Sequence, residues 1–166
     1  FHAFELPLII ARPFNTFGPR QSSRAVIPTI ISQIANNSTE LKLGDMKPTR
    51  EFNYVSDTCD GFIALSKAED IFGETINIGS NREISIEDLA NLIKKLMDSD
   101  IKIVQEEQRK RPKGSEVMRL KCDNSKIISL TGFEAQTGLE NGLIKTIEWF
   151  KNPNNLAKYK TGIYNI

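Results

Sequence analysis

The chain has 166 residues, with 22 lysines and arginines against 21 aspartates and glutamates, which leaves a formal charge of +1 at pH 7. This balance argues against a general binder of nucleic acids or membrane surfaces, so any bound anion must be recognised by local arginines. No apolar run is long enough to span a bilayer and no targeting leader follows Phe1, so a cytoplasmic protein is expected.

Two cysteines and one histidine give little material for a metal or redox site. Cys59 and Cys122 are far apart in the sequence, and neither belongs to a CxxC pair. His2 is the single possible nitrogen ligand, so neither a zinc site nor a disulfide framework is expected. We expect both cysteines to be buried free thiols in a reducing cytoplasm.

The first third of the chain predicts a strand, a helix and two more strands. The apolar run at residues 6–11 is typical of a strand buried on both faces of a parallel sheet. Apolar residues at helical spacing over 26–34 predict a helix. Residues 41–43 then predict a short strand that enters the turn at 44–48, and residues 52–55 predict another.

The middle of the chain continues this alternation. Ser56 or Asp57 is expected to cap a helix, and residues 75–79 alternate like a strand that stops at a glycine. Ser85 followed three residues later by Asp88 is a capping-box pattern, which predicts the start of an amphipathic helix.

The last third predicts a strand and two helices. Residues 101–104 favour a strand, and Asp123 is expected to cap a short helix through Leu130. Apolar residues over 139–150 predict a final helix that ends at Asn152-Pro153. The polar tail offers two possible anchors, Tyr159 and Tyr164. The pattern indicates an α/β protein without an obvious linker.

The spacing of the glycines excludes one loop for nucleotide phosphates, and no tyrosine is followed by a lysine four residues later. No two glycines are closer than Gly138 and Gly142, so there is no GxGxxG loop for a dinucleotide phosphate. The tyrosines Tyr54 and Tyr159 are followed four residues later by Thr58 and Ile163, so no Tyr-x-x-x-Lys is present. We therefore expect no phosphate-binding loop of the GxGxxG type in the chain.

Arginines beside turns are the remaining candidates for chemistry. Arg12, Arg24, Arg50 and Arg111 each adjoin a predicted turn or element end. Guanidinium groups bind phosphate in a bidentate way, so several converging arginines would form a pyrophosphate clamp. The alternative is that they are solvated loop charges, which are more common. Arg109 is assigned to the solvated face.

Seven blocks occur in an order that resembles one enzyme family. They are residues 12–19, 26–28, 50–57, 74–79, 111–112, 123–126 and 146–150. The chain resembles the C-terminal half of extended short-chain dehydrogenase/reductases, in particular the NAD-dependent epimerases and 4,6-dehydratases of nucleotide sugars. Residues 111–120 followed by 123–126 most resemble UDP-N-acetylglucosamine 4,6-dehydratases of legionaminic-acid biosynthesis, a bacterial surface-sugar pathway.

This resemblance implies a fold, a domain division and an oligomeric state. Residues 1–166 would be the C-terminal fragment of one enzyme, with the last strands of a Rossmann-type NAD(P)-binding fold and a smaller substrate-binding α/β lobe. Residues 1–14 and 55–79 would be the Rossmann remnant, and 15–54 and 80–166 the nucleotide-sugar-binding lobe. The parent would be a homodimer that uses NAD, and the fragment would self-associate through exposed sheet surface.

The resemblance also implies which residues bind ligands. Contacts to the UDP-sugar are expected from Asn15, Arg24, Leu41, Lys42, Leu43, Arg50, Ser85, Arg111 and Glu116, and contacts near the nicotinamide from Pro13, Phe14 and Thr16. Arg50 and Arg111 would bind phosphate, while the backbone of residues 41–43 would edge the base. Asn15 has the alternative of a turn former, Ser85 that of a helix cap, and Glu116 that of packing rather than a ribose contact.

The implied reaction belongs to the parent enzyme. The catalytic motif of the family is Tyr-x-x-x-Lys, and its absence from the sequence implies that this chain holds no catalytic residue and does not retain NAD. Bound NAD would oxidise the sugar at C4, water would be lost across C5 and C6, and hydride would return to C6. This half would position the substrate. Three alternatives stay open: a 4-epimerase, a decarboxylase of the same superfamily, and a non-catalytic sensor of nucleotide sugars or dinucleotides.

Overall fold

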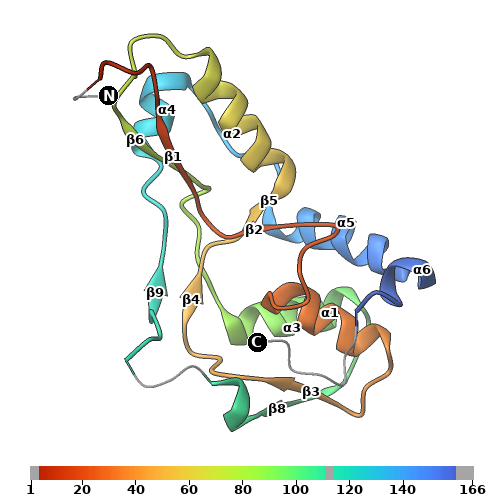
Figure 1. The fold of residues 1–166 in the computed structure, drawn as a ribbon. Coiled ribbons are helices and arrows are strands. Elements are labelled where there is room, and N and C mark those ends of the chain that lie inside the picture. The colour runs from red at the N-terminus through yellow and green to blue at the C-terminus, as the bar shows by residue number, and fades with distance from the viewer. Residues whose placement is uncertain (1–3, 111–113, 160–166) are drawn as a thin grey trace. The chain divides into compact units, whose positions relative to one another are not determined.

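The chain alternates between two compact units along its sequence (Figure 1). A computed structural model describes residues 4–110 and 114–159. Unit 1 consists of Phe1–Phe17, Glu51–Glu83 and Leu120–Leu139, and unit 2 of Gly18–Arg50, Ile84–Arg119 and Glu140–Ile166. The expected α/β fold with parallel strands is confirmed.

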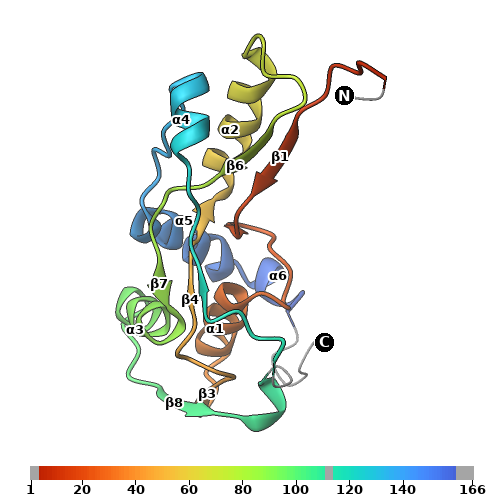
Figure 2. The same cartoon turned by 90° about the vertical axis from the view of Figure 1, so that its left-hand side faces the viewer.

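In its described residues, unit 1 contains two pairs of parallel strands and two helices. Strand β1 (Ile10–Pro13) pairs with β6 (Thr75–Ile78), and β2 (Thr16–Phe17) pairs with β5 (Asn53–Tyr54). Figure 2 shows β1 and β6 side by side, with helices α2 (Val55–Lys67) and α4 (Ser125–Thr131) next to β6. One core lies among them, formed by Leu65, Ile71, Ile76, Ile78, Ile127 and Phe133.

The close packing of α2 on β6 depends on a glycine. A Cβ at Gly61 would lie 2.5 Å from Cγ2 of Ile78, closer than two carbon atoms can approach. The absence of a side chain at Gly61 therefore allows α2 to pack closely on β6.

The first strand begins later than predicted, and it is largely exposed. Residues 6–9 precede β1, which begins at Ile10 and continues to Pro13. Three of its four residues are exposed, and Ile10 retains 49% of its surface. Among the described residues β1 pairs with β6 and is not covered on both faces, which agrees with the exposed sheet surface that the resemblance implied for this fragment.

Two predicted helix caps in unit 1 are also wrong. Helix α2 begins at Val55 after Tyr54, without a side-chain cap. Asp57 is instead buried and accepts a hydrogen bond from the backbone N–H of Thr137 at 2.9 Å. Helix α4 begins at Ser125 after Asn124, although Asp123 does accept from the Ser125 backbone N–H at 3.0 Å. Hydrogen bonds from Ser125 lower the pKa of Asp123.

Unit 2 places helices on short strands. Strand β3 (Glu40–Leu43) pairs in parallel with β8 (Lys102–Gln105), and helices α1 (Val26–Ala35) and α3 (Ile86–Leu96) contact each other. The core includes the α1 isoleucines, Leu41, Leu43, Leu89 and Ile93. Strand β4 (Thr49–Arg50) pairs antiparallel with β7 (Ile84–Ser85), and β9 (Arg119–Leu120) lies on its other edge.

The C-terminal part of unit 2 is helical. The 3-10 helix η1 (Glu107–Arg109) follows β8, and α5 (Leu139–Lys151) and α6 (Pro153–Leu156) come later. The predicted stop at Asn152-Pro153 is confirmed, with Asn152 capping α6. Tyr159 anchors the tail as expected, because it packs against Trp149 and Phe150 and donates to the Gln21 carbonyl at 2.7 Å. Burial raises the pKa of Tyr159, while Tyr164 lies outside the described residues.

Three further findings bear on the sequence predictions. The part of the chain that the structure describes contains no helix long and apolar enough to cross a membrane. Those same residues hold no group of three or more potential metal ligands. Cys122 is buried as expected, whereas Cys59 is exposed on α2, so the prediction of two buried thiols is wrong for Cys59.

Candidate functional site

Arg50 and Glu116 form an ion pair in unit 2. Arg50 ends β4, where its Nη1 donates to the Thr49 carbonyl at 2.8 Å and its Nη2 donates to the Glu116 carboxylate. The side chains of Arg50 and Glu116 are only 13% and 22% exposed. A guanidinium has five N–H donors, so these two hydrogen bonds fix its plane and leave others for a ligand. The structure thus brings together two of the predicted binding residues.

Ser85 lies beside Arg50 in the same sheet. In the β4–β7 register Thr49 faces Ser85, and Arg50 faces Ile84. The Ser85 hydroxyl accepts from the Asp88 backbone N–H at 3.0 Å and lies 2.6 Å from Asp88 Oδ2. The predicted N-cap is confirmed, and the hydroxyl is already engaged in capping α3.

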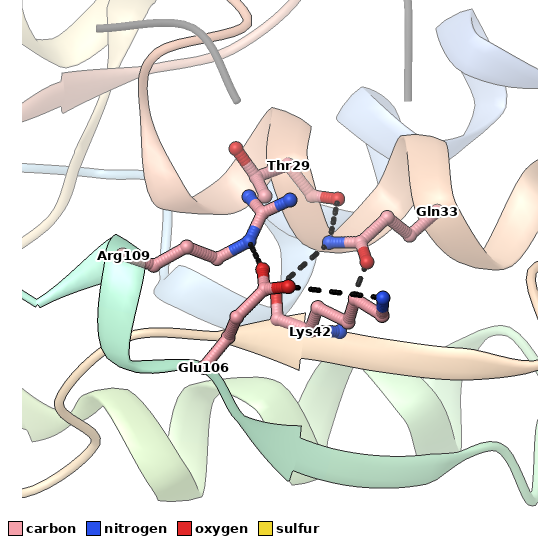
Figure 3. A network of polar contacts seen from close by, with 5 residues as sticks. All are labelled: Thr29, Gln33, Lys42, Glu106 and Arg109. Atoms are coloured by element: carbon pink, nitrogen blue, oxygen red, sulfur yellow. Dashed lines mark hydrogen bonds and ion pairs between the residues drawn. The ribbon is translucent and has the colours of Figure 1, made fainter. Parts of the chain in front are cut away.

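The predicted base-binding segment is β3. Leu41 and Leu43 are buried, and the Lys42 side chain is exposed. Figure 3 shows how Gln33 of α1 holds this strand: its Nε2 donates to the Lys42 carbonyl at 3.1 Å, and its Oε1 accepts from the Lys42 N–H at 2.9 Å. The Leu43 carbonyl accepts from the Glu106 N–H at 2.8 Å. Much of the segment's backbone is therefore already hydrogen-bonded inside unit 2.

A charged cluster lies at the end of this strand pair. Glu106 accepts from Arg109 Nε at 2.5 Å, and Lys42 Nζ is 3.7 Å from its other oxygen (Figure 3). The hydrogen bond from Arg109 is the largest cause that lowers the pKa of Glu106. The Arg109 side chain is only 11% exposed. The assignment of Arg109 to the solvated face is therefore wrong, because its neighbour Glu106 provides a partner.

The remaining predicted arginines are less informative. Arg24 is exposed just before α1, and its backbone N–H donates to Ser22 Oγ at 3.3 Å. Arg12 is exposed on β1. Arg111 lies outside the described residues, so its predicted role in a clamp with Arg50 stays a prediction.

The turn after β1 in unit 1 is held by hydrogen bonds. The Phe14 N–H donates to the Ile78 carbonyl at 3.0 Å, and Pro13 is exposed beside it. Asn15 Nδ2 donates to the Glu51 carbonyl at 2.9 Å. Thr16 Oγ1 lies 2.9 Å from Thr58 Oγ1. Pro13 ends β1 and Thr16 begins β2, so the four predicted residues 13–16 lie at the carboxyl end of β1 and in the link to β2. Open parallel sheets bind ligands at such strand ends.

Glu51 is a buried polar residue that sequence reasoning missed. Its side chain is fully buried and accepts backbone hydrogen bonds from Ser80, Asn81 and Cys122. An acidic residue between Arg50 and Phe52 gives no sign of burial, because acidic residues are usually solvated. Its partners come from distant parts of the sequence, so no local pattern could have revealed it.

Cys122 lies against this carboxylate and is an inert thiol. Burial, followed by the negative charges of Glu51 and Asp123, raises the pKa of Cys122 to about 12. A thiolate is the nucleophilic form of cysteine, so this residue does not serve as a nucleophile at neutral pH.

Solved structures show which class of protein has this fold. UDP-glucuronic acid 4-epimerase from Bacillus cereus, in complex with UDP-glucuronic acid and NAD, matches 90% of this chain and 47% of its own with a TM-score of 0.82 and 28% identity. Epimerase Mth375 from Methanothermobacter thermautotrophicus matches 95% of this chain and 47% of its own, with a TM-score of 0.84 and 30% identity. The fold is that of the Rossmann-type extended short-chain dehydrogenase/reductases.

Sequence comparisons identify the family within this class. The UDP-N-acetyl-alpha-D-glucosaminuronate decarboxylase of Bacillus cytotoxicus is 39% identical over 155 residues, 90% of this chain and 48% of that protein. The dTDP-D-glucose 4,6-dehydratase of Mus musculus is 32% identical over 154 residues, which are 89% of this chain and 42% of that protein. The family described as GDP-mannose 4,6 dehydratase matches residues 1–146, and the chain belongs to this family.

The chain corresponds to only part of the length of its relatives. The chain spans less than half the length of these two relatives. The relatives are sugar-nucleotide dehydratases, decarboxylases and epimerases, which confirms the predicted superfamily.

Proposed function

We propose that this chain is the nucleotide-sugar-binding portion of an NAD-dependent sugar-nucleotide 4,6-dehydratase, with UDP-N-acetylglucosamine as its substrate. The observation that carries the proposal is the Arg50 guanidinium, which is mostly buried and fixed on β4 by Thr49 and Glu116. An arginine held in this way is suited to a diphosphate, because its remaining N–H donors form a rigid fork. The family match supports the reaction class.

Other predicted residues take secondary roles in this proposal. The exposed Lys42 side chain adds positive charge to unit 2, and Arg111 is proposed as a second phosphate ligand. Glu116 orients Arg50 through their ion pair. In unit 1, Asn15 is proposed to hydrogen-bond the sugar nucleotide. These residues bind and orient the substrate, which is the positioning part of catalysis.

The described residues fit the nicotinamide end of an NAD site. Pro13 is the last residue of β1 and Phe14 follows it, next to the end of β6, where ligands of open α/β sheets bind. NAD, when bound, would supply hydride exchange with the sugar during dehydration across C5 and C6. Its pyrophosphate would be held by residues that this chain does not contain, since the sequence has no GxGxxG loop.

A decarboxylase is the second candidate function. The relative with 39% identity is named as a UDP-N-acetyl-alpha-D-glucosaminuronate decarboxylase. Incubating the complete enzyme separately with UDP-N-acetylglucosamine and with UDP-N-acetylglucosaminuronate distinguishes the two. A 4-keto-6-deoxy product from the first substrate supports the dehydratase, and carbon dioxide from the second supports the decarboxylase. Interconversion of 4-epimers would support an epimerase, and binding without turnover a sensor.

Replacement of Arg50 tests the binding site directly. We expect Arg50→Ala to weaken UDP binding by about 1.5–3 kcal/mol, the range for a hydrogen bond to a charged group. Arg50→Lys should restore part of the loss, because a point charge cannot reproduce the guanidinium fork. Isothermal titration calorimetry of UDP with the complete enzyme measures both variants.

The control replaces a positive charge outside the predicted site. Lys95 is exposed on α3, so Lys95→Ala should leave UDP affinity nearly unchanged. Arg109 cannot serve as this control, because its ion pair with Glu106 makes it part of the structure. Equal losses from Arg50→Ala and Lys95→Ala would indicate diffuse charge and contradict the proposed site.

A further inference from the structure

Glu51 of unit 1 is a fully buried carboxylate held by backbone amides. Oε1 accepts from the N–H groups of Ser80 at 2.5 Å and Asn81 at 3.2 Å, and Oε2 accepts from that of Cys122 at 2.7 Å. Within residues 4–110 and 114–159, no lysine or arginine forms an ion pair with it. Backbone N–H groups therefore stabilise this carboxylate in place of the cation that usually pairs with a buried acid.

The loop around Glu51 is shaped to hold this carboxylate. Asn81 has a φ of 59°, which turns successive N–H groups toward one point, as in anion-binding nests. A Cβ at Gly79 would lie 2.2 Å from Glu51 Oε1, so only glycine leaves room for the carboxylate there. Asn124 Nδ2 donates to the Gly79 carbonyl at 2.9 Å and fixes the same loop.

The backbone of Glu51 connects this anchor to Asn15. The Glu51 carbonyl accepts from Asn15 Nδ2 at 2.9 Å. Asn53 adds a second connection, because its Nδ2 donates to Glu51 Oε1 at 3.3 Å while its backbone N–H donates to the Asn15 carbonyl at 2.9 Å. Hydrogen bonds therefore connect both the side chain and the main chain of Asn15 to residues that the Glu51 carboxylate holds in place.

Asn15 keeps hydrogen-bonding capacity after these contacts. Its side-chain oxygen and its second amide hydrogen have no partner among the residues that the structure describes, and the residue is half-buried. An asparagine fixed in one rotamer loses less entropy on binding a ligand than one that moves freely.

We propose that Glu51 is a positioning residue, which fixes the Asn15 side chain before the sugar nucleotide binds. The inference rests on the proposed function, in which Asn15 contacts the UDP-sugar. In this proposal Glu51 does not contact the ligand, yet its replacement should measurably lower the affinity for the ligand. Removing the anchor should weaken UDP-sugar binding about 3- to 10-fold, the factor that corresponds to ordering one side chain.

The test is a double-mutant cycle in the complete enzyme, with affinity for UDP-N-acetylglucosamine measured by calorimetry. Its members are Glu51→Gln, Asn15→Ala and the double variant. If Glu51 acts through Asn15, each single variant binds more weakly, and the double variant binds no more weakly than Asn15→Ala alone. A purely structural role would not produce this dependence on Asn15. Glu69→Gln, at an exposed acid of unit 1, is the matched control and should change nothing.

Each other outcome has a definite meaning. Losses that multiply in the double variant, or unchanged binding by Glu51→Gln, overturn the inference. If Glu51→Gln does not fold, Glu51→Asp takes its place, because it keeps the charge but shortens the side chain. Failure of both to fold assigns Glu51 to stability alone and also overturns the inference. If Arg50→Ala weakens binding while Asn15→Ala does not, the inference fails and the proposed function stands. Absence of binding by the unchanged enzyme overturns both.

Discussion

Glu51 and Cys122 illustrate how one buried charge determines the chemistry of its neighbour. The Cys122 N–H stabilises the carboxylate through its hydrogen bond, while the thiol lies in the field of that same carboxylate. Desolvation and like charge both disfavour a thiolate, so they act in the same direction on Cys122. A polar group can thus be fully buried and fully bonded and still make an adjacent residue unreactive.

We expect the two cysteines to differ strongly in reactivity. At about pH 8 the exposed Cys59 should react readily with a thiol reagent, whereas Cys122 should react only when the protein unfolds. Labelling with iodoacetamide, followed by mass spectrometry of the peptides, measures both rates. Equal labelling of the two cysteines in the folded protein would contradict the buried environment of Cys122.

The same raised pKa links stability to pH. The folded-state pKa of Cys122 is about 12, against an ordinary value of 9.0, so the unfolded chain releases this proton first. The stabilisation from the protonated thiol is therefore complete below pH 9.0 and is lost as the pH rises toward about 12. Urea denaturation across this range should show a smaller loss in Cys122→Ala than in the unchanged chain.

Gln33 shows at the level of elements how a side chain can complete a sheet. Strand β3 has β8 on one edge, and on the other edge the Gln33 amide bonds both backbone groups of Lys42. The side chain thereby takes the place of a neighbouring strand and fixes α1 to β3. Gln33 is 4% exposed, so water cannot easily replace these bonds.

Removing this amide should destabilise unit 2. We expect Gln33→Met, which keeps the length but not the hydrogen bonds, to lower the free energy of unfolding by about 1–3 kcal/mol, because the part-buried backbone groups of Lys42 lose their partners. Urea denaturation followed by circular dichroism measures the change. Gln105→Met, at an exposed position of β8, is the control, and an equal effect of the two substitutions would disprove the role of Gln33.

Elements with local determinants could be predicted from the sequence, and those with distant partners could not. Helices α1, α3 and α5 were evident from apolar spacing, and the Ser85 cap depends only on Asp88. The expected caps at Ser56 and Asp57 failed because Asp57 bonds to Thr137, far along the chain.

The candidate site divides in the same way. Arg50 could be proposed from its motif and the family resemblance, but its ion pair with Glu116 could not. Arg109 is an exception, because its partner Glu106 is only three residues away, but the pair depends on the 3-10 helix η1, which was not predicted. Glu51 was missed since its backbone donors come from two distant segments, at Ser80–Asn81 and at Cys122. The role of each predicted residue in binding stays a prediction.

At the scale of the whole molecule, most of the exposed large apolar side chains that the structure describes belong to unit 1. They are Phe4, Leu6, Leu8, Ile10, Val55, Phe62, Ile63, Phe72, Ile128 and Leu130. Exposed apolar surface of this kind commonly marks an interface, and within the described residues no strand pairs with the second edge of β1. The relatives are about twice as long as this chain, so in the proposed enzyme further residues are available to cover it.

We expect the isolated chain to self-associate for this reason. Light scattering during size-exclusion chromatography should show a mass that rises with protein concentration. The double variant Phe62→Lys, Ile63→Glu places charges on the exposed face of α2 and should reduce the association. A monomer at all concentrations would contradict this prediction, as would association unaffected by the two charges.

The interleaving of the two units affects how the chain can fold during its synthesis. Strand β1 emerges from the ribosome long before β6, its partner in unit 1, because Ile10 pairs with Thr75. The core of unit 1 also needs Ile127 and Phe133, which are made after most of unit 2. Unit 2 in turn includes residues from 140 onward. Neither unit can therefore be completed on the ribosome until nearly the whole chain has been made, and the early apolar segments must be kept from aggregation until then.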